Sequence, residues 1–143
     1  MSQENVEIVR ALIPPPDADL APILREDSLF EATSEALGFV LHSELESVAV
    51  WQGGTAYAGV QGFREMWLDW LQPYVAYYTQ VDEIIDAGDR VVVLVRDRAR
   101  LSDTDYEVDL MAGSVWELRE GRIVRVQFCA NREQALEAAG LRE

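Results

Sequence analysis

The sequence predicts an α+β fold in which a curved, mostly antiparallel sheet wraps over N-terminal helices and encloses an internal pocket. Three observations support this prediction. From Tyr78 to Phe128 the chain is a succession of strand patterns joined by short turns. An amphipathic helix pattern at 63–71 precedes these strands, and a capped helix pattern at 131–139 follows them and stops at Gly140. A helix-then-sheet chain of this size buries its helix faces against the sheet.

Two helices are predicted before the first strand. Apolar residues recur at helical spacing from 4 to 13, and the prolines at 14–16 end this helix because proline lacks a backbone N–H. Residues 17–27 are interpreted as a linker with one helical turn. Ser28 then begins the second helix, since Ser28 and Glu31 form the pattern of a capping box.

A first strand is predicted at 45–51, and the third helix follows it at 63–71. The apolar residues of this helix fall at i, i+3, i+4, i+7 and i+8 and form one stripe: Phe63, Met66, Trp67, Trp70 and Leu71. We expect the stripe to be buried against the concave face of the sheet.

Four antiparallel strands in a meander are predicted next, at 77–86, 91–101, 107–119 and 122–130. These strands carry apolar residues on both faces near their middles, as 91–95 shows. One face covers the helices, so the other face also needs cover. We therefore predict a homodimer through the outer face of the sheet.

The composition describes a small acidic protein, which we expect to form a single domain over 1–143. Its formal net charge of −14 repels phosphate backbones and anionic lipids, so neither nucleic acid nor a membrane is expected as a partner. The N-terminus lacks the pattern of a signal peptide, and the single Cys129 excludes an internal disulfide. We expect a cytoplasmic location.

Five segments, in this order, resemble SnoaL-like proteins of the superfamily named after nuclear transport factor 2. They are MSQENVEIVR (1–10), YAGVQGFREMW (57–67), IDAGDRVVV (85–93), VWELREGRIVR (115–125) and REQALEAAGL (132–141). The resemblance implies a cone-shaped α+β fold, often a homodimer through the sheet. Members include ketosteroid isomerases, limonene epoxide hydrolases, polyketide cyclases, scytalone dehydratase and many non-enzymes, so function has to be argued from the pocket residues.

The catalytic residues that the resemblance implies are mostly missing. The isomerase base falls near Val50 and Trp51, neither of which accepts a proton from carbon, and the acid donor falls at Ser114, a weak donor. Glu46 is a nearby carboxylate, which the pattern places at a solvated strand edge. For the epoxide hydrolases, Arg96 could match the arginine, but one residue of three is not a catalytic set.

The arginines of one strand are open to two interpretations. Arg96, Arg98 and Arg100 share one face by alternation. They could bind an anionic ligand, or they could pair across the sheet with Glu107 and Asp109.

His42 is interpreted as the end of the second helix, where a cation is favoured by the helix dipole. As the only histidine it cannot build the usual multi-histidine metal site, so we expect no metal and no cofactor.

The function that these residues favour is the binding of a small hydrophobic molecule in the pocket, with no assignable reaction. The alternative is an isomerase, cyclase or hydrolase with a non-standard acid–base set drawn from Glu46, His42, Arg96 or Ser114, and a third hypothesis is a structural or regulatory dimer. The candidate pocket residues are Ser114, Trp116, Phe128, Trp51, Arg96, His42 and Glu46.

Overall fold

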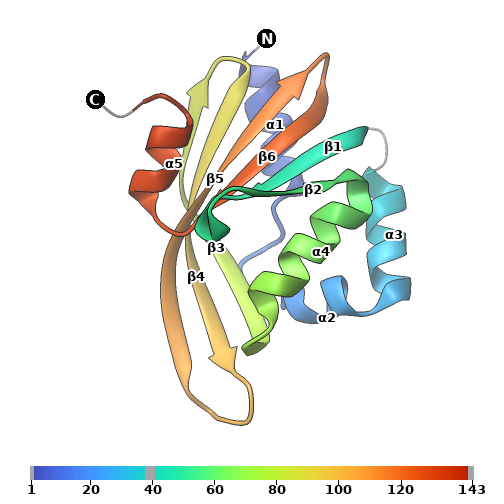
Figure 1. Ribbon diagram of the computed structural model, residues 1–143, viewed down its shortest axis with the longest axis vertical. Coiled ribbons are helices and arrows are strands. Elements are labelled where there is room, and N and C mark those ends of the chain that lie inside the picture. Colours follow the sequence, from blue (N-terminus) through green and yellow to red (C-terminus); the bar gives the residue numbers. More distant parts are fainter. Residues whose placement is uncertain (1, 38–40, 142–143) are drawn as a thin grey trace.

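The computed structural model describes residues 2–37 and 41–141, and within them it has the α+β architecture that the sequence predicts (Figure 1). In chain order the elements are α1 (Ser2–Leu12), α2 (Leu20–Arg25), α3 (Asp27–Leu37), β1 (Leu41–Ala49), the 3-10 turn η1 (Val50–Gln52), β2 (Thr55–Ala58), α4 (Gly59–Leu71), β3 (Tyr74–Ala87), β4 (Arg90–Leu101), β5 (Glu107–Arg119), β6 (Arg122–Cys129) and α5 (Arg132–Ala138).

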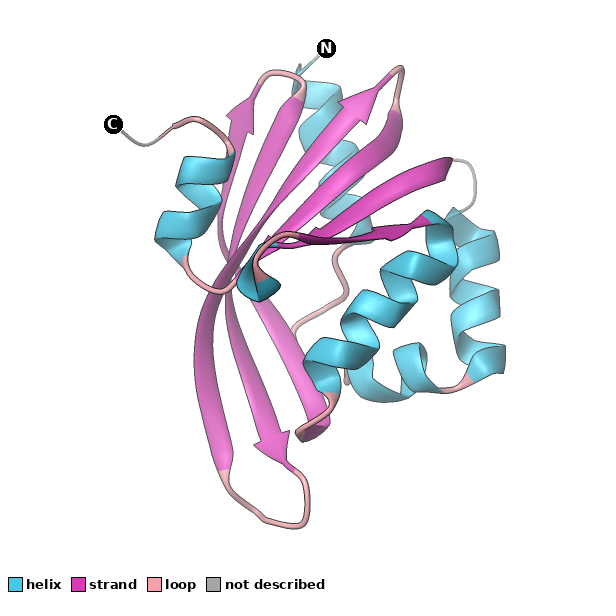
Figure 2. Ribbon diagram, in the orientation of Figure 1, coloured by secondary structure: helices cyan, strands magenta, loops and turns pink. Residues whose placement is uncertain are grey.

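The strands form one curved, strongly twisted sheet in the order β2-β1-β6-β5-β4-β3 (Figure 2). The meander from β3 to β6 is antiparallel throughout, as predicted. The strand β1 joins it by pairing parallel to β6, and β2 extends the sheet beyond β1 in the antiparallel sense. The β4–β5 hairpin projects away from the helices at one end of the molecule (Figure 1).

Helices cover both faces of the sheet. On the inner face, Val6 and Val9 of α1 pack in one core cluster with Val91 and Val93 of β4. On the outer face, Ala135 of α5 packs with the apolar residues that alternate with these, among them Val92 and Leu94. Alternate residues of β4 therefore belong to two different cores, because neighbouring side chains of a strand point to opposite faces.

The close approach of α5 depends on a glycine in β5. A Cβ placed on Gly113 would lie 2.7 Å from the Cβ of Ala135 and 3.1 Å from Cδ2 of Leu94. Carbon atoms at 2.7 Å overlap, so the absence of a side chain at this position allows the helix to rest on the sheet.

The N-terminal helices differ from the prediction. The segment predicted as a linker with one helical turn contains α2, a helix of six residues. Its first turn is capped by Asp19, since Asp19 Oδ1 accepts a hydrogen bond from the Ala21 N–H at 3.0 Å. The helix α3 begins at Asp27, so Ser28 lies inside its first turn. The prediction that His42 ends this helix is wrong, because His42 lies on β1.

One arginine of α4 holds α2 and α3 in place. Arg64 donates to the carbonyls of Leu24 at 2.7 Å and Arg25 at 2.9 Å, and it forms an ion pair with Asp27 at 2.8 Å. Its guanidinium also lies 5.0 Å from the centroid of the Phe30 ring. A charged side chain with this many partners is strongly oriented, so it fixes the two short helices against α4.

Candidate functional site

The inner face of the sheet and the helices α1 to α4 enclose a cavity of about 230 Å³. Its wall is predominantly apolar, and all four tryptophans of the chain contribute to it. The aromatic residues of the wall are Phe30, Trp51, Phe63, Trp67, Trp70, Tyr77, Trp116 and Phe128. Of the predicted α4 stripe, Met66 is fully buried, whereas Phe63, Trp67 and Trp70 are half-buried and border the cavity.

The aromatic rings contact one another around this cavity. The Trp67 ring meets Tyr77 at a centroid distance of 5.8 Å and Phe128 at 5.4 Å. Phe128 in turn lies 5.9 Å from Trp116. A further edge-to-face pair, at 5.0 Å, joins Trp70 to Trp51 of the turn η1. Such pairs favour one geometry, so the rings support one another as a rigid wall.

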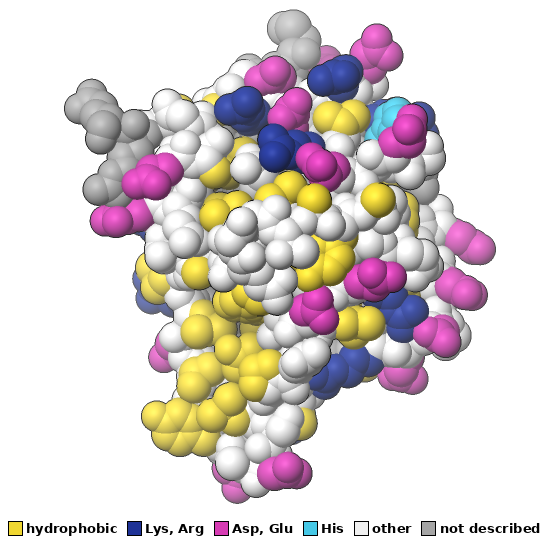
Figure 3. Space-filling model, viewed as in Figure 1, with side chains coloured by type: hydrophobic (Ala, Val, Ile, Leu, Met, Phe, Trp, Pro, Cys, Tyr) yellow, Lys and Arg dark blue, Asp and Glu magenta, His cyan; other side chains and the backbone are white. Residues whose placement is uncertain are grey.

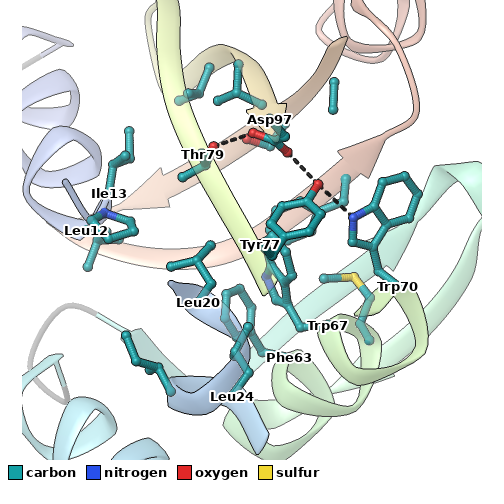
Figure 4. A pocket seen from close by; sticks show the side chains of 18 of the residues that line it. Leu12, Ile13, Leu20, Leu24, Phe63, Trp67, Trp70, Tyr77, Thr79 and Asp97 are labelled. Atoms are coloured by element: carbon teal, nitrogen blue, oxygen red, sulfur yellow. Dashed lines mark hydrogen bonds between the residues drawn. The ribbon is translucent and has the colours of Figure 1, made fainter. Parts of the chain in front are cut away.

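A buried carboxylate interrupts this apolar wall. Asp97 lies on the inner face of β4 with 3% of its surface exposed, and it lines the cavity. Its two oxygens accept hydrogen bonds from the hydroxyls of Thr79 and Tyr77, each at 2.5 Å. The Tyr77 hydroxyl accepts a hydrogen bond from Nε1 of Trp70 at 2.8 Å, so the four side chains form one chain of hydrogen bonds (Figure 4).

Burial raises the pKa values of the two titratable groups in this hydrogen-bond chain, Asp97 and Tyr77. Loss of hydration raises the pKa of Asp97, because the ionised carboxyl is stabilised less inside the protein than in water. The hydrogen bonds from Thr79 and Tyr77 act in the opposite direction and favour the ionised form. The pKa of Tyr77 is also raised, first by burial and then by the neighbouring Asp97, so its hydroxyl stays protonated and remains a donor.

A further polar group lines the cavity on β5. Nε1 of Trp116 donates to Oγ of Ser114 at 2.7 Å, two residues along the same face of β5. The Ser114 hydroxyl, which accepts this bond, can donate its own proton to a ligand. Cys129, the residue after Phe128, instead packs on the outer face in the core cluster under α5, and burial raises the pKa of its thiol to about 11, so this thiol is protonated at neutral pH.

The structure brings together four of the seven candidate pocket residues. Trp51, Ser114, Trp116 and Phe128 all line the cavity. Whether they bind a ligand stays a prediction.

The other three candidates lie outside the cavity wall. Glu46 is half-exposed on β1 and forms an ion pair with Arg125 at 2.9 Å. His42 uses Nδ1 to accept a hydrogen bond from the Glu44 N–H. Arg96 is exposed on the outer face of β4, where it approaches Asp82 at 3.8 Å. An acid–base set built from Glu46, His42 and Arg96 is therefore not assembled at the cavity.

The row of arginines on β4 matches the cross-strand interpretation in its register. Arg98 lies opposite Asp109, and Arg100 lies opposite Glu107. The guanidinium of Arg98 also lies 5.0 Å from the centroid of the Tyr78 ring, on the other neighbouring strand.

Asp97 is the functional candidate that sequence reasoning missed, although the signal was present. Alternation that puts Arg96 and Arg98 on the outer face puts the residue between them on the inner face. An aspartate in line with Val93, Val95 and Ala99 is a charged residue at a core position, which is rare without a specific role.

Metal-binding clusters and membrane-spanning helices are both absent from residues 2–37 and 41–141. These residues contain no group of three or more His, Cys, Asp or Glu side chains arranged to hold a metal ion. Over the same part of the chain, no helix is long and apolar enough to cross a bilayer.

Comparison with known proteins identifies a family and a fold. The model of the SnoaL-like domain family matches residues 31–126. No curated protein matches the chain.

Similar solved structures include a proposed SnoaL-like polyketide cyclase from Jannaschia sp. CCS1, with a TM-score of 0.66 and 15% identity over 99% of this chain and 94% of that one. A proposed hydroxylase from Streptomyces galilaeus, AclR, gives 0.61 and 13% over 100% and 88%. A protein of ketosteroid isomerase-like fold from Catenulispora acidiphila, solved in complex with trimethylamine, gives 0.60 and 15% over 95% and 94%.

Proposed function

The chain belongs to the SnoaL-like domain family, and from this premise we propose that it binds a small, largely apolar molecule in the internal cavity. The observation that carries the proposal is the composition of the wall, in which eight aromatic side chains surround one buried polar chain centred on Asp97. Pockets of this kind bind ligands by burial of apolar surface, while a few polar groups fix the orientation. The ligand therefore places its polar group toward Asp97 or Ser114.

Tryptophan fluorescence tests this proposal, because every tryptophan of the chain lines the cavity. Small uncharged alcohols such as cyclohexanol and 2-phenylethanol should change the emission with dissociation constants on the order of 0.1–1 mM, given their few atoms. Ala112→Phe should abolish the response, because Ala112 lines the cavity and the added ring occupies it. Met111→Phe is the matched control, since Met111 points outward from the same strand and is 48% exposed. Equal titrations of both variants would contradict the proposal.

A second candidate function is acid–base catalysis by Asp97, in an isomerase, cyclase or hydrolase. The raised pKa of this carboxyl favours it, because a general base works best when its pKa approaches the working pH. The existence of a proposed cyclase with the same fold adds support. In the reaction, the ionised carboxylate takes a proton from carbon next to a carbonyl, and the electron pair moves to the carbonyl oxygen as an enolate.

Proton exchange in D₂O tests this chemistry without knowledge of the natural substrate. NMR would follow the exchange of the α-protons of a small ketone such as cyclohexanone. The protein should accelerate exchange, and Asp97→Asn should abolish the acceleration, whereas Asp109→Asn on the outer face should not change it. Exchange at the rate of the buffer alone, with cyclohexanone bound, would reject catalysis of this kind and leave binding in place.

The proposal also includes the assembly and location expected from the sequence. These are a homodimer through the sheet and a cytoplasmic location, with neither nucleic acid nor membrane as a partner. The strong negative charge supports the last point, because it opposes the approach of polyanions.

A further inference from the structure

The carboxylate of Asp97 has no cationic partner within the described residues. Its hydrogen-bond donors, Thr79 and Tyr77, are neutral hydroxyls. No arginine or histidine is among the described residues that line the cavity, and the sequence contains no lysine. The flanking Arg96 and Arg98 lie exposed on the opposite face of β4.

A buried charge without a partner is unfavourable, and a cation inside the cavity would remove this cost. Burial therefore raises the pKa of Asp97 in the empty protein, since protonation is the other way to neutralise the charge. Uptake of a cation would reverse that effect, because a positive charge nearby favours the ionised carboxylate.

The aromatic wall is suited to the same charge. The faces of Trp and Tyr rings carry negative electrostatic potential and attract cations, most strongly where water is excluded. Trp67, Trp70 and Tyr77 all line the cavity, and Tyr77 is hydrogen-bonded to the carboxylate itself. The carboxylate and the electron-rich rings thus belong to one connected group (Figure 4).

The hydrogen bonds already present limit the kind of cation. Both oxygens of Asp97 accept hydrogen bonds from the protein, and the rest of the wall is almost entirely apolar. A primary amine or a guanidinium would bring several N–H donors into a site with few free acceptors, which is costly. A cation whose nitrogen carries only carbon substituents needs no acceptor and buries its methyl groups against the apolar wall.

We propose that the cavity is a site for an organic cation, a quaternary ammonium group carried on a small apolar body, held between Asp97 and the aromatic wall. This inference rests on the proposed function, because it names the class of molecule that occupies the same cavity. The negative charge of the whole protein assists it by raising the local concentration of cations.

Two probes of nearly the same shape separate the contribution of positive charge to binding from that of shape. Choline and 3,3-dimethyl-1-butanol have nearly the same shape, but only choline is positive. Calorimetry in 150 mM salt should give choline an affinity at least about tenfold higher, which corresponds to ~1.4 kcal/mol. Benzyltrimethylammonium should bind more tightly than choline, because its ring buries more apolar surface.

Asp97→Asn should reduce the preference for choline at least about threefold, because the rings still attract the cation but its charge is no longer balanced by a carboxylate. Asp109→Asn is the matched control, since it removes the same charge from an exposed site and should leave the preference unchanged.

If Asp97→Asn does not fold, the wild-type protein can still show whether choline binds beside the ionised carboxylate of Asp97. Choline binding should strengthen as pH rises through the pKa of Asp97, and over that pH interval it should release protons, seen as a dependence of the calorimetric enthalpy on the buffer.

The outcomes separate this inference from the proposed function. Equal binding of choline and 3,3-dimethyl-1-butanol, or no effect of Asp97→Asn on their ratio, would overturn the cation site and leave an apolar pocket. A preference for choline that Asp109→Asn also removes would show surface attraction only and would overturn it as well. No binding of choline, of 3,3-dimethyl-1-butanol or of any alcohol would overturn the proposed function itself.

Discussion

Thr79 and Asp97 lie directly opposite each other on β3 and β4, and the Thr79 hydroxyl donates to Asp97 Oδ1 across the strand pair at 2.5 Å. Tyr77, two residues before Thr79, reaches the other carboxylate oxygen from the same strand. The register of one antiparallel pair therefore positions the only carboxylate among the described residues that line the cavity. The pairing of β3 with β4 therefore sets where Asp97 lies relative to Thr79 and Tyr77.

The first prediction concerns the pH dependence of stability. Burial raises the pKa of Asp97 in the folded state above its unfolded value, so the folded protein holds this proton more tightly. The resulting stabilisation is fully present below the unfolded-state pKa and is lost as pH rises through the folded-state pKa. The unfolding free energy of wild type minus that of Asp97→Asn should therefore decrease as pH rises over this interval. Urea unfolding at a series of pH values measures it, and a difference independent of pH would contradict the expectation.

The second prediction concerns the hydroxyl at the centre of the hydrogen-bond chain. Tyr77→Phe leaves Nε1 of Trp70 without its acceptor and removes one of the donors to Asp97. The variant should lose about 1–3 kcal/mol of unfolding free energy, the usual cost of unpaired buried polar groups. Tyr106→Phe serves as control, because Tyr106 is 65% exposed and should change stability by less than about 0.5 kcal/mol. Equal effects of the two substitutions would show that the buried hydroxyl contributes nothing.

The third prediction concerns the contact between α5 and β5. Gly113→Ala should destabilise the protein by about 1–3 kcal/mol, because the new methyl group overlaps the Ala135 side chain. Ala135→Gly alone should cost about 1 kcal/mol, the helix penalty of glycine. Together they should cost less than the sum, since Ala135→Gly removes the overlapping atom. Thermal or urea unfolding of the four proteins gives the coupling, and simple additivity would refute this packing.

The fourth prediction concerns assembly. The apolar residues Val92 and Leu94, which suggested an uncovered outer face, are covered by α5 of the same chain. What remains of that face includes Met111 beside the arginine row of β4. Figure 3 shows hydrophobic side chains gathered on the viewed face over the lower part of the sheet, toward the β4–β5 hairpin.

Light scattering should give the mass of a homodimer at micromolar concentration. Met111→Asp should shift it toward the monomer, because a charge buried without a partner at an interface is unfavourable. Leu29→Asp is the matched control, since Leu29 is 42% exposed on α3, away from the sheet. A monomer in the wild type would refute the dimer, and equal effects of the two variants would refute the interface.

Local patterns were sufficient to predict the strands of the meander and the cap of α5. The meander has strands of eight to fourteen residues, and the turns after β3 and β5 carry the glycines Gly88 and Gly121. The cap of α5 was also predictable, and the Asn131 side chain does accept a hydrogen bond from the Gln134 N–H at 2.9 Å.

Elements that depend on distant partners could not be predicted in the same way. The strand β2 has four residues and is mostly exposed, so it shows no alternation of its own and exists because β1 pairs with it. The parallel pairing of β1 with β6 joins segments far apart in the sequence. The prediction that β1 extends to Trp51 was wrong, because the chain turns at Val50 into η1.

Alternation along a strand predicts which of its side chains face the cavity. Ser114 and Trp116 were placed on one face of β5, and they line the cavity together. The same rule applied to β4 concerned only the outward arginines, so Asp97 was overlooked. His42 and Glu46 were chosen for their chemistry, and only the tertiary structure shows that they lie outside the cavity wall.

The bonds of Arg64 to α2 and α3 bear on the rates of ligand binding and release rather than on affinity. Leu20, Leu24 and Phe30 of α2 and α3 form part of the cavity wall, and Arg64 ties these helices to α4. If a molecule enters between α4 and these helices, the helices have to part, and the hydrogen bonds and ion pair of Arg64 oppose that opening. Arg64→Met keeps much of the side-chain bulk but removes the hydrogen bonds and the ion pair. For a ligand that uses this route, the substitution would then increase the rates of both association and dissociation. The residence time of the ligand would change through a residue that lies outside the cavity wall.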